Sequence, residues 1–328
     1  MRIALLGFGS VGQGIARALR EKDLGISITG IADSRSGLIA PGGIDIDAAL
    51  AQKRELGYCG DPSVRPMDVA LLAEYDALVE VTPTDVITGE PALTHIRAAL
   101  GRGRHVVTSN KGPIALAYDD LIAEAESRHV SLRYEATVCG AIPIIHALQE
   151  GLAGNRVKRL SGVLNGTCNY ILTRMSDEGL TYEQALMEAR ELGYAEADPT
   201  YDVKGIDAAI KLVILANTIL HMDKALDDVQ ITGIDLLTPD ALRLAEEQEM
   251  TIRLIGEIIP DEDILRVSPR IIGKAHPLVV EGTLNAVTVD TDMAGEITFI
   301  GKGAGSVETA SAIIGDLLFI RDRYVTGT

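Results

Sequence analysis

The sequence predicts an α/β protein in which a doubly wound parallel sheet is joined to an α+β domain with a mixed sheet. Three observations predict this fold class. A chain of 328 residues exceeds the size at which one hydrophobic core stops growing, so we expect two domains. The chain opens with an apolar strand pattern that leads directly into a glycine-rich turn and a helical pattern. Strand and helix patterns then alternate through the first half of the chain.

Composition narrows the class of function. Hydrophobic residues make up 47% of the chain, with three Phe and no Trp, so the core is built mainly from Ala, Val, Ile and Leu. Acidic residues outnumber basic ones by 47 to 30, for a net charge of −17, which argues against nucleic acid as a partner. Met1 is followed by no basic signal segment, and no apolar run has membrane-spanning length. We therefore expect a cytoplasmic protein with no membrane partner.

The glycine turn follows the first strand pattern, residues 2–6, and precedes a helical pattern over residues 13–20. Its six residues are Gly7, Phe8, Gly9, Ser10, Val11 and Gly12. In a Rossmann-type fold the first glycine allows the tight turn, the second lets the backbone approach a pyrophosphate, and the third lets the helix pack on the strand. The helix N-terminus then faces the phosphates. This segment predicts a dinucleotide site.

Asp33 follows the second strand pattern, residues 26–32, at the place where a carboxylate accepts hydrogen bonds from the adenosine ribose. The alternative is an ordinary turn residue at a strand end. Arg35 has the opposite preference, because with help from Lys53 or Arg54 it would attract a 2′-phosphate that Asp33 repels. The sequence leaves the choice between NAD and NADP open.

Three further strand patterns continue the alternation. They cover residues 77–81, 105–107 and 130–134, with helical patterns at 91–99 and 114–125. Ligands of doubly wound sheets bind beyond the carboxyl ends of the strands. The residues at those ends are Thr82, Pro83 and Thr84, then Thr108, Ser109, Asn110 and Lys111, then Glu135, Ala136 and Thr137. We expect these segments to line the cofactor and substrate crevice.

Five sequence blocks, in order along nearly the whole chain, resemble those of homoserine dehydrogenases. They are Val79–Thr84, Val107–Pro113, Ala136–Pro143, Leu164–Leu172 and Leu192–Thr200, followed by Asp202, Gly205, Asp207, Ala208 and Lys211. The resemblance implies an oxidoreductase that interconverts L-homoserine and L-aspartate 4-semialdehyde with NADP or NAD. It also implies a place in the biosynthesis of threonine, methionine and isoleucine.

Lys211 and Asp207 lie four residues apart in a strongly apolar helical pattern, residues 203–220, so they share one helix face. The alternative is a surface ion pair, but the apolar neighbours favour a partly buried pair on a cleft wall. Oxidation of an alcohol needs a group that takes the hydroxyl proton. The resemblance implies that Lys211 has this role.

Lys111, at the end of the fourth strand pattern, is expected to contact nicotinamide and substrate and to take part in proton transfer. The resemblance implies that Glu196 contacts the substrate ammonium and that Asp202 and Asp207 orient substrate or lysine. Asp198 is either a substrate ligand or part of a loop that precedes the next helix, and the sequence favours neither. The predicted substrate-binding residues are Glu196, Asp202, Asp198, Tyr194, Thr167 and Lys111.

The domain boundaries follow from these motifs. We expect a dinucleotide-binding domain at residues 1–136, a helix at 304–321 that packs back on it, and a substrate-binding and dimerisation domain at 137–303. The resemblance places the backbone of the glycine turn around Gly303 near the cofactor, with Lys302 where relatives carry proline. The predicted cofactor-binding residues are Gly7–Gly12, Asp33, Arg35, Thr82, Pro83, Thr84, Ser109, Asn110, Lys111 and Gly303.

The segment after the fifth strand pattern resembles the family's monovalent-cation loop, in which a carboxylate and backbone carbonyls bind sodium. The matching residues are Glu135, Val138, Gly140 and Ile142. Oxygen-only ligation suits a hard cation. Cys139 occupies a position that is usually glycine, so we expect strain if the loop needs a positive φ there. Cys59, Cys139 and Cys168 lack CxxC spacing, and we expect small, buried, reduced thiols.

The remaining patterns complete the second domain. They predict helices at 182–191 and 239–248, strands at 250–259, 265–272 and 286–290, and a terminal helix at 310–320. The resemblance implies dimerisation through this domain. The length matches a short form of the family, so we expect no C-terminal regulatory domain.

Two other kinds of protein are compatible with this fold class. An aspartate or diaminopimelate dehydrogenase shares the two-domain plan, but the Asn165-Gly166-Thr167 and Glu196–Pro199 blocks argue against it. A nucleotide-sensing protein on an inactive dehydrogenase fold would have no need of the acid/base set, so the presence together of Lys111, Glu196, Asp207 and Lys211 argues against it.

Overall fold

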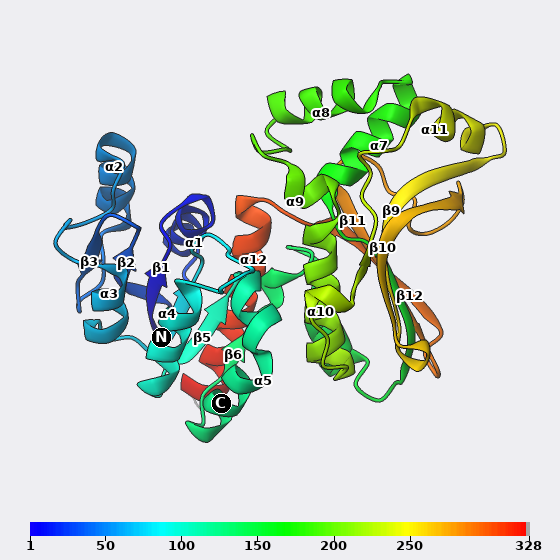
Figure 1. The fold of residues 1–328 in the computed structure, drawn as a ribbon. Helices are drawn as coiled ribbons and strands as arrows, with labels where there is room; N and C mark the ends of the chain where they lie inside the picture. Colours follow the sequence, from blue (N-terminus) through cyan, green and yellow to red (C-terminus); the bar gives the residue numbers. More distant parts are fainter. Residues whose placement is uncertain (326–328) are drawn as a thin grey trace. The chain divides into compact units, whose positions relative to one another are not determined.

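The computed structural model describes residues 1–325 and divides the chain into two compact units. The first unit holds residues 1–140 and the chain from Gly305 onward, and the second holds residues 141–304. Each unit contains one six-stranded sheet (Figure 1). Among the described residues, no helix combines the length and the apolar character that crossing a lipid bilayer requires.

The sheet of the first unit has the strand order β3-β2-β1-β4-β5-β6. Its strands are β1 (Arg2–Leu6), β2 (Ser27–Ala32), β3 (Gly37–Ile39), β4 (Ala77–Glu80), β5 (His105–Thr108) and β6 (Leu132–Arg133). All neighbouring pairs are parallel except β2 and β3. The predicted doubly wound parallel sheet is confirmed, and the antiparallel edge strand β3 is an addition that the sequence patterns did not indicate.

Helices cover this sheet. They are α1 (Ser10–Glu21), α2 (Ile46–Leu56), α3 (Pro66–Leu72), α4 (Ala92–Gly101), α5 (Lys111–Ser127) and α12 (Ser306–Ile320). Asp45 caps α2 by accepting a hydrogen bond from the N–H of Ala48, and Gly57 ends the helix with φ 78°. The predicted helix over 13–20 is α1, which begins three residues earlier, inside the glycine turn.

The final helix, α12, belongs to the first unit although a whole unit separates it from α1 in the sequence. Ser306 Oγ donates a hydrogen bond to the carbonyl of Ser10 at 2.7 Å. Gly14 permits this approach, because a Cβ there would lie 2.6 Å from Ser306 Oγ. Further along α12, Asp316 is fully buried and accepts hydrogen bonds from Arg133 Nε and from the N–H of Glu135, both at 3.1 Å.

The second unit has a mixed sheet with the strand order β12-β11-β7-β9-β10-β8. Its strands are β7 (Val157–Val163), β8 (Gln230–Ile231), β9 (Met250–Ile259), β10 (Ile264–Gly273), β11 (Leu284–Thr291) and β12 (Glu296–Lys302). All pairs are antiparallel except β8 with β10. The predicted mixed sheet is confirmed, and β7, β8 and β12 are strands that the sequence patterns did not indicate.

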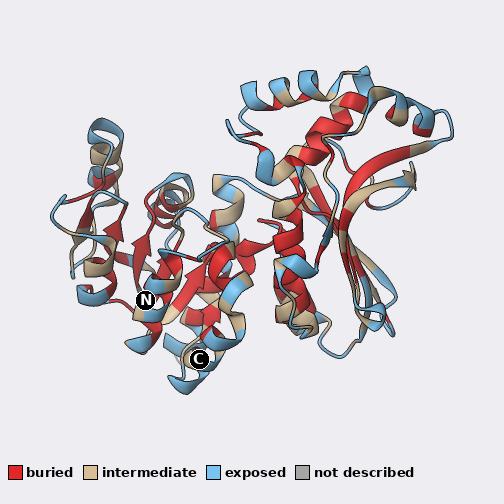
Figure 2. Ribbon diagram, in the orientation of Figure 1, coloured by how far each residue is buried: buried red, intermediate tan, exposed pale blue. Residues whose placement is uncertain are grey.

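The helices of the second unit are α6 (Ile144–His146), α7 (Gly166–Glu178), α8 (Tyr182–Glu191), α9 (Thr200–Val203), α10 (Ile206–Leu220) and α11 (Pro239–Glu246). Helix α10 packs against β9 and β10, and every residue from Ala208 to Ala216 is buried (Figure 2). The helical pattern over 203–220 resolves into two helices, because Gly205 turns the chain with φ 84° between α9 and α10.

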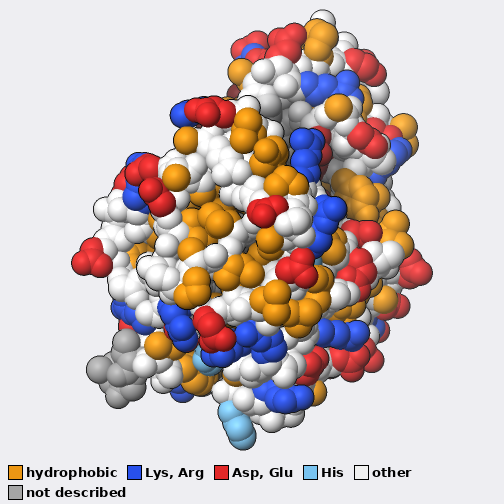
Figure 3. All heavy atoms as spheres, turned by 90° about the vertical axis from the view of Figure 1, so that its left-hand side faces the viewer, with side chains coloured by type: hydrophobic (Ala, Val, Ile, Leu, Met, Phe, Trp, Pro, Cys, Tyr) orange, Lys and Arg blue, Asp and Glu red, His pale blue; other side chains and the backbone are white. Residues whose placement is uncertain are grey.

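The face of the molecule drawn in Figure 3 carries charges of both signs. On the side of the first unit that carries α2 and β3, acidic and basic side chains are interspersed among hydrophobic ones (Figure 3). The three thiols lie in the interior, since Cys59, Cys139 and Cys168 are all at most 1% exposed. The expectation that they are small buried residues is confirmed.

Asp316→Ala is expected to lower the free energy of unfolding by about 3–5 kcal/mol, because Arg133 and the N–H of Glu135 lose a buried ionic partner. Urea unfolding followed by circular dichroism measures the change. Ser311→Ala, at an exposed position of the same helix, is the matched control and should change stability by less than about 0.5 kcal/mol. If Asp316→Ala lost no more stability than the control, Asp316 would not be the buried ionic partner that stabilises Arg133 and the N–H of Glu135.

Candidate functional site

The glycine turn between β1 and α1 is shaped by close backbone contacts. Gly7 has φ 103°, and a Cβ there would lie 2.4 Å from the carbonyl oxygen of Val81. A Cβ on Gly12 would lie 2.0 Å from the carbonyl oxygen of Gly7. A Cβ on Gly9, in contrast, would meet no atom of residues 1–325 within 4 Å. Two glycines are therefore required by packing, and Gly9 leaves open space where a pyrophosphate would approach the helix N-terminus.

The side chains of this turn differ in accessibility. Phe8 is 1% exposed and belongs to the core cluster of the sheet, so only its backbone faces the turn. Gly9 and Ser10 are exposed, and Val11 is half-buried. The turn is thus suited to phosphate binding through backbone N–H groups and the Ser10 hydroxyl.

Asp33, at the end of β2, is 6% exposed and already holds several donors. Its Oδ1 accepts hydrogen bonds from the N–H groups of Arg35 and Ser36, and its Oδ2 lies 2.6 Å from Lys53 Nζ of α2. Burial raises the pKa of Asp33, but the hydrogen bonds from Lys53 and Arg35 outweigh it and hold that pKa below its ordinary value. The Asp33 carboxylate is therefore charged and neutralised by Lys53.

The end of β4 carries a buried carboxylate that the sequence did not single out. Glu80 is fully buried, and its Oε1 accepts hydrogen bonds from both the N–H and the hydroxyl of Thr82. His95 Nδ1 of α4 lies 3.5 Å from the same oxygen. Glu80 thereby fixes the first residue of the loop 82–84, whose next residues, Pro83 and Thr84, lie nearer the solvent.

Asn110 links that loop to the start of α5. Its Oδ1 accepts a hydrogen bond from the N–H of Gly112 and caps the helix, and its Nδ2 donates to the carbonyls of Thr82 at 3.1 Å and Pro83 at 3.2 Å. The side chain is 1% exposed. Lys111, the first residue of α5, and the half-buried Ser109 flank this cap. Asn110 therefore holds Lys111 in a fixed relation to the loop 82–84.

The predicted cation loop begins with a short 3₁₀ turn, Glu135–Thr137. Glu135 is 3% exposed, so a buried carboxylate, an oxygen ligand of the kind that hard cations prefer, is present in this turn. Cys139 has φ 56° and Gly140 φ 49°. The φ of Cys139 is thus positive, which is the condition under which strain is expected from a residue other than glycine. Ile142 belongs to the second unit, so the full set Glu135, Val138, Gly140 and Ile142 stays a prediction.

In the second unit, Asn165 lies between β7 and α7 and is 5% exposed. Its Oδ1 accepts a hydrogen bond from the N–H of Cys168, and its Nδ2 donates to Asp202 Oδ1 at 2.6 Å and Asp207 Oδ2 at 2.9 Å. Burial raises the pKa of the Cys168 thiol well above its ordinary value, and Sγ donates to the carbonyl of Asp202. Cys168 is thus a protonated structural donor, not a nucleophile.

Lys211 and Asp207 form the ion pair expected from their spacing. Lys211 Nζ lies 2.7 Å from Asp207 Oδ2 and donates to the carbonyl of Leu164 at 2.6 Å. The lysine is 7% exposed, so the predicted burial is confirmed. The carbonyl of Leu164 also accepts a hydrogen bond from Asn285 Nδ2 at 3.0 Å.

The other predicted substrate residues lie on or near the loop between α8 and α9. Thr167 Oγ1 donates to the carbonyl of Tyr194, whose ring centroid lies 4.9 Å from that of Tyr170. Asp198 accepts hydrogen bonds from the N–H and hydroxyl of Thr200, which lower its pKa. Glu196 is exposed. Asp198 therefore has a turn-forming role here, and its contact with substrate stays a prediction.

Gly303 has a structural reason to be glycine, because a Cβ there would lie 2.1 Å from Asn285 Nδ2. The same Asn285 holds the carbonyl of Leu164 beside Lys211.

The residues that the sequence did not single out, Glu80, Asn165 and Asn285, share one property. Each is buried and contacts a segment distant in the chain, for which one sequence offers no local signal.

Comparison with known proteins agrees with this geometry. A family model described as homoserine dehydrogenase matches residues 143–318, and one described as its NAD-binding domain matches residues 7–135. A homoserine dehydrogenase of Methanocaldococcus jannaschii is 45% identical over 332 residues, covering 98% of each chain. A crystal structure from Archaeoglobus fulgidus, described as a putative homoserine dehydrogenase, has a TM-score of 0.92 at 46% identity and covers 98% of this chain and 99% of its own.

A solved complex adds information on the cofactor. A hyperthermophilic archaeal homoserine dehydrogenase bound to NADPH has a TM-score of 0.84 at 30% identity and covers 98% of each chain. The close backbone at Gly7 and Gly12 and the open space at Gly9 fit such a dinucleotide.

Lys53→Ala is expected to weaken NADPH binding by about tenfold or more while NADH binding changes less than about twofold, because Asp33 then repels the 2′-phosphate without compensation. Titration of nucleotide fluorescence measures both dissociation constants. Lys22→Ala, at the exposed C-terminal end of α1, is the control. Equal losses for both nucleotides would show that Lys53 does not discriminate between them.

Proposed function

The chain belongs to the homoserine dehydrogenase family, and on that premise we propose that Lys211 is the group that exchanges a proton with the substrate oxygen. The chain is an NAD(P)-dependent oxidoreductase that interconverts L-homoserine and L-aspartate 4-semialdehyde. The observation that supports the role of Lys211 is its position, 7% exposed with Nζ aimed by Asp207 Oδ2 and the carbonyl of Leu164.

The proposed proton transfer follows from the reaction. When bound, the nicotinamide would supply the hydride acceptor for oxidation at the hydroxyl-bearing carbon of homoserine. The hydroxyl proton must leave in the same process, and Lys211 Nζ takes it, directly or through one water. In aldehyde reduction Lys211 returns a proton to the carbonyl oxygen. Asp207 orients the amine and compensates its charge when it is protonated.

We propose that acidic and polar side chains of the second unit orient the substrate. Glu196 would bind the substrate ammonium, and Asp202 would orient the substrate from α9. Tyr194, Thr167 and Asp198 complete the proposed pocket wall. Lys111, fixed by the capped start of α5, would contact the nicotinamide and the substrate oxygen.

The domain roles follow from the same assignments. We assign dinucleotide binding to residues 1–136 with the helix 304–321, and substrate binding and dimerisation to 137–303. Asp33, Arg35 and Lys53 would select the adenosine ribose, and Arg35 is exposed and available for a 2′-phosphate. Glu135 and the carbonyls of Val138, Gly140 and Ile142 would hold a sodium ion. The cytoplasm is the proposed location, as for an enzyme of amino-acid biosynthesis.

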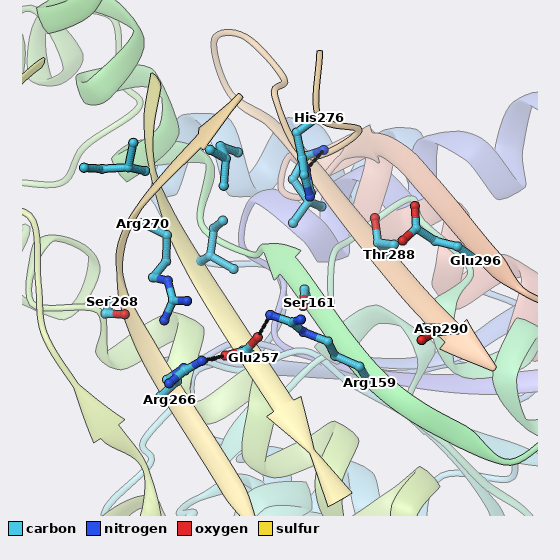
Figure 4. A pocket seen from close by; sticks show the side chains of 14 residues that line it. Arg159, Ser161, Glu257, Arg266, Ser268, Arg270, His276, Thr288, Asp290 and Glu296 are labelled. Carbon is cyan, nitrogen blue, oxygen red and sulfur yellow. Dashed lines mark hydrogen bonds and ion pairs between the residues drawn. The ribbon is translucent and has the colours of Figure 1, made fainter. Parts of the chain in front are cut away.

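A homodimer is proposed through the sheet face opposite α10. Within the second unit, this face holds a cavity of about 160 Å³, whose buried Glu257 is bound by Arg159 and Arg266 (Figure 4). Arg270 lies on one side of the cavity, and Asp290 and Glu296 lie on the other (Figure 4). A two-fold axis would bring Arg270 of each copy to acidic groups of the other, so the face is complementary to itself.

Lys211→Met is expected to lower the turnover number for homoserine by about 10²–10⁴-fold, because the proton acceptor is removed while the side-chain volume is kept. Nicotinamide absorbance measures turnover, and fluorescence titration checks that NADPH binding is retained. Lys204→Met, an exposed lysine beside α9, should keep wild-type turnover. Near wild-type turnover in Lys211→Met would refute the proposed mechanism.

Arg270→Glu is expected to convert the dimer into a monomer of 34.9 kDa, because like charges then face each other across the interface. Light scattering after size-exclusion chromatography measures the mass. The double variant Arg270→Glu with Glu296→Arg should recover the dimer. Arg243→Glu, on the exposed face of α11, is the control. A monomeric wild type at micromolar concentration would exclude the proposed dimer.

A further inference from the structure

Asn165 has more hydrogen-bonding contacts than a helix cap requires. Its Oδ1 caps α7 through the N–H of Cys168 at 2.8 Å, and this ordinary role is open to Asp and Ser as well. Only an amide adds two donors to that acceptor. Both donors are used, for Asp202 of α9 and Asp207 of α10. One buried side chain therefore joins the helices α7, α9 and α10.

The two acceptors of this amide are both carboxylates. Asp202 Oδ1 lies 2.6 Å and Asp207 Oδ2 2.9 Å from the same nitrogen, so two negative groups come within about 5.5 Å of each other. Like charges at this separation repel unless donors lie between them. The Asn165 amide is such a donor and lies between the two oxygens.

Asn165 also has a direct connection to Lys211. Asp207 Oδ2 accepts from Asn165 Nδ2 and from Lys211 Nζ at 2.7 Å, so one oxygen serves both groups. The residue before it, Leu164, supplies the second acceptor of Nζ at 2.6 Å. Residues 164 and 165 thus determine where the amine lies, through a carbonyl and through Asp207.

We propose that Asn165 is a positioning residue that holds Asp202 and Asp207 together and thereby sets the direction and protonation of Lys211. The proposal rests on the proposed function of Lys211 as proton acceptor. The amide does not touch the reacting atoms. It keeps Asp207 turned toward Nζ, and without it the two carboxylates would separate or one would take up a proton.

Asn165→Ser and Asn165→Asp separate this role from helix capping. Both replacements keep an oxygen that can cap α7, and both remove the amide donors. We expect the melting temperature to stay within a few degrees of wild type and kcat to fall about 10- to 100-fold in both variants. The KM for the nicotinamide nucleotide should stay unchanged. Thr181→Ala removes only the cap of α8 in the same unit and is the control.

The pH dependence gives a second readout. In the Asn165→Asp variant, a protonated carboxyl at this position can donate a hydrogen bond, whereas an ionised one adds a third negative charge. The ratio of Asn165→Asp to wild-type kcat should therefore rise as the pH falls, and the ratio for Asn165→Ser should not. Turnover of both variants within twofold of wild type would overturn the proposal. So would a loss of kcat that only follows a loss of melting temperature.

The titration of Lys211 distinguishes this proposal from the proposed function. Reductive ¹³C-methylation and NMR follow that amine without substrate, with Lys211→Met to assign its signal. We expect Asn165→Ser to move the titration to lower pH, because Asp207 turns away from Nζ or takes up a proton, and the amine loses the negative charge that favours its protonated form. An unchanged titration overturns the positioning role. A shifted titration in a chain whose wild type does not oxidise homoserine would support the positioning role and refute the proposed function.

Discussion

A charge that leaves water must be met by a partner, and this constraint shapes both units. In the second unit, Lys211 and Asp207 are buried together because the carbonyl of Leu164 and the amide of Asn165 complete their hydrogen bonds. In the first unit, Asp33 is compensated by Lys53, and Asp316 by Arg133. The helices that carry these residues are thereby held at defined positions on their sheets. The proposed catalytic and binding side chains on those helices are therefore held in fixed positions as well.

Each unit contains an asparagine that caps a helix and also binds a second segment of the chain. Asn110 and Asn165 each cap the helix that follows a strand end, and the side-chain amide of each also donates hydrogen bonds to another segment of the chain. Asn110 reaches the carbonyls of Thr82 and Pro83, and Asn165 reaches two carboxylates. Ser or Asp would cap these helices comparably well, so the choice of asparagine reflects the second function of the side chain. In each unit, the residue that caps one helix therefore also fixes a second segment of the chain.

The local features of the fold could be predicted from sequence, because they depend on residues close together in the chain. The turn at Gly7, most strand and helix positions, and the pair Asp207 and Lys211 all have a period or spacing to identify them. Strand β3 is three residues long and has no such signal. The contacts of Asn165 span 37 and 42 residues, and that of Lys53 with Asp33 spans 20. Such partners become apparent only when the chain is folded.

The location of α12 bears on how the chain reaches this state. The first unit is built from both ends of the sequence, with α12 packed on α1, while the second unit is one continuous insertion, residues 141–304. During synthesis the N-terminal residues emerge first, yet their sheet lacks α12 until residues 306–320 have left the ribosome. The inserted unit holds all its own strands earlier. The first unit is therefore the first to begin synthesis and the last to be complete.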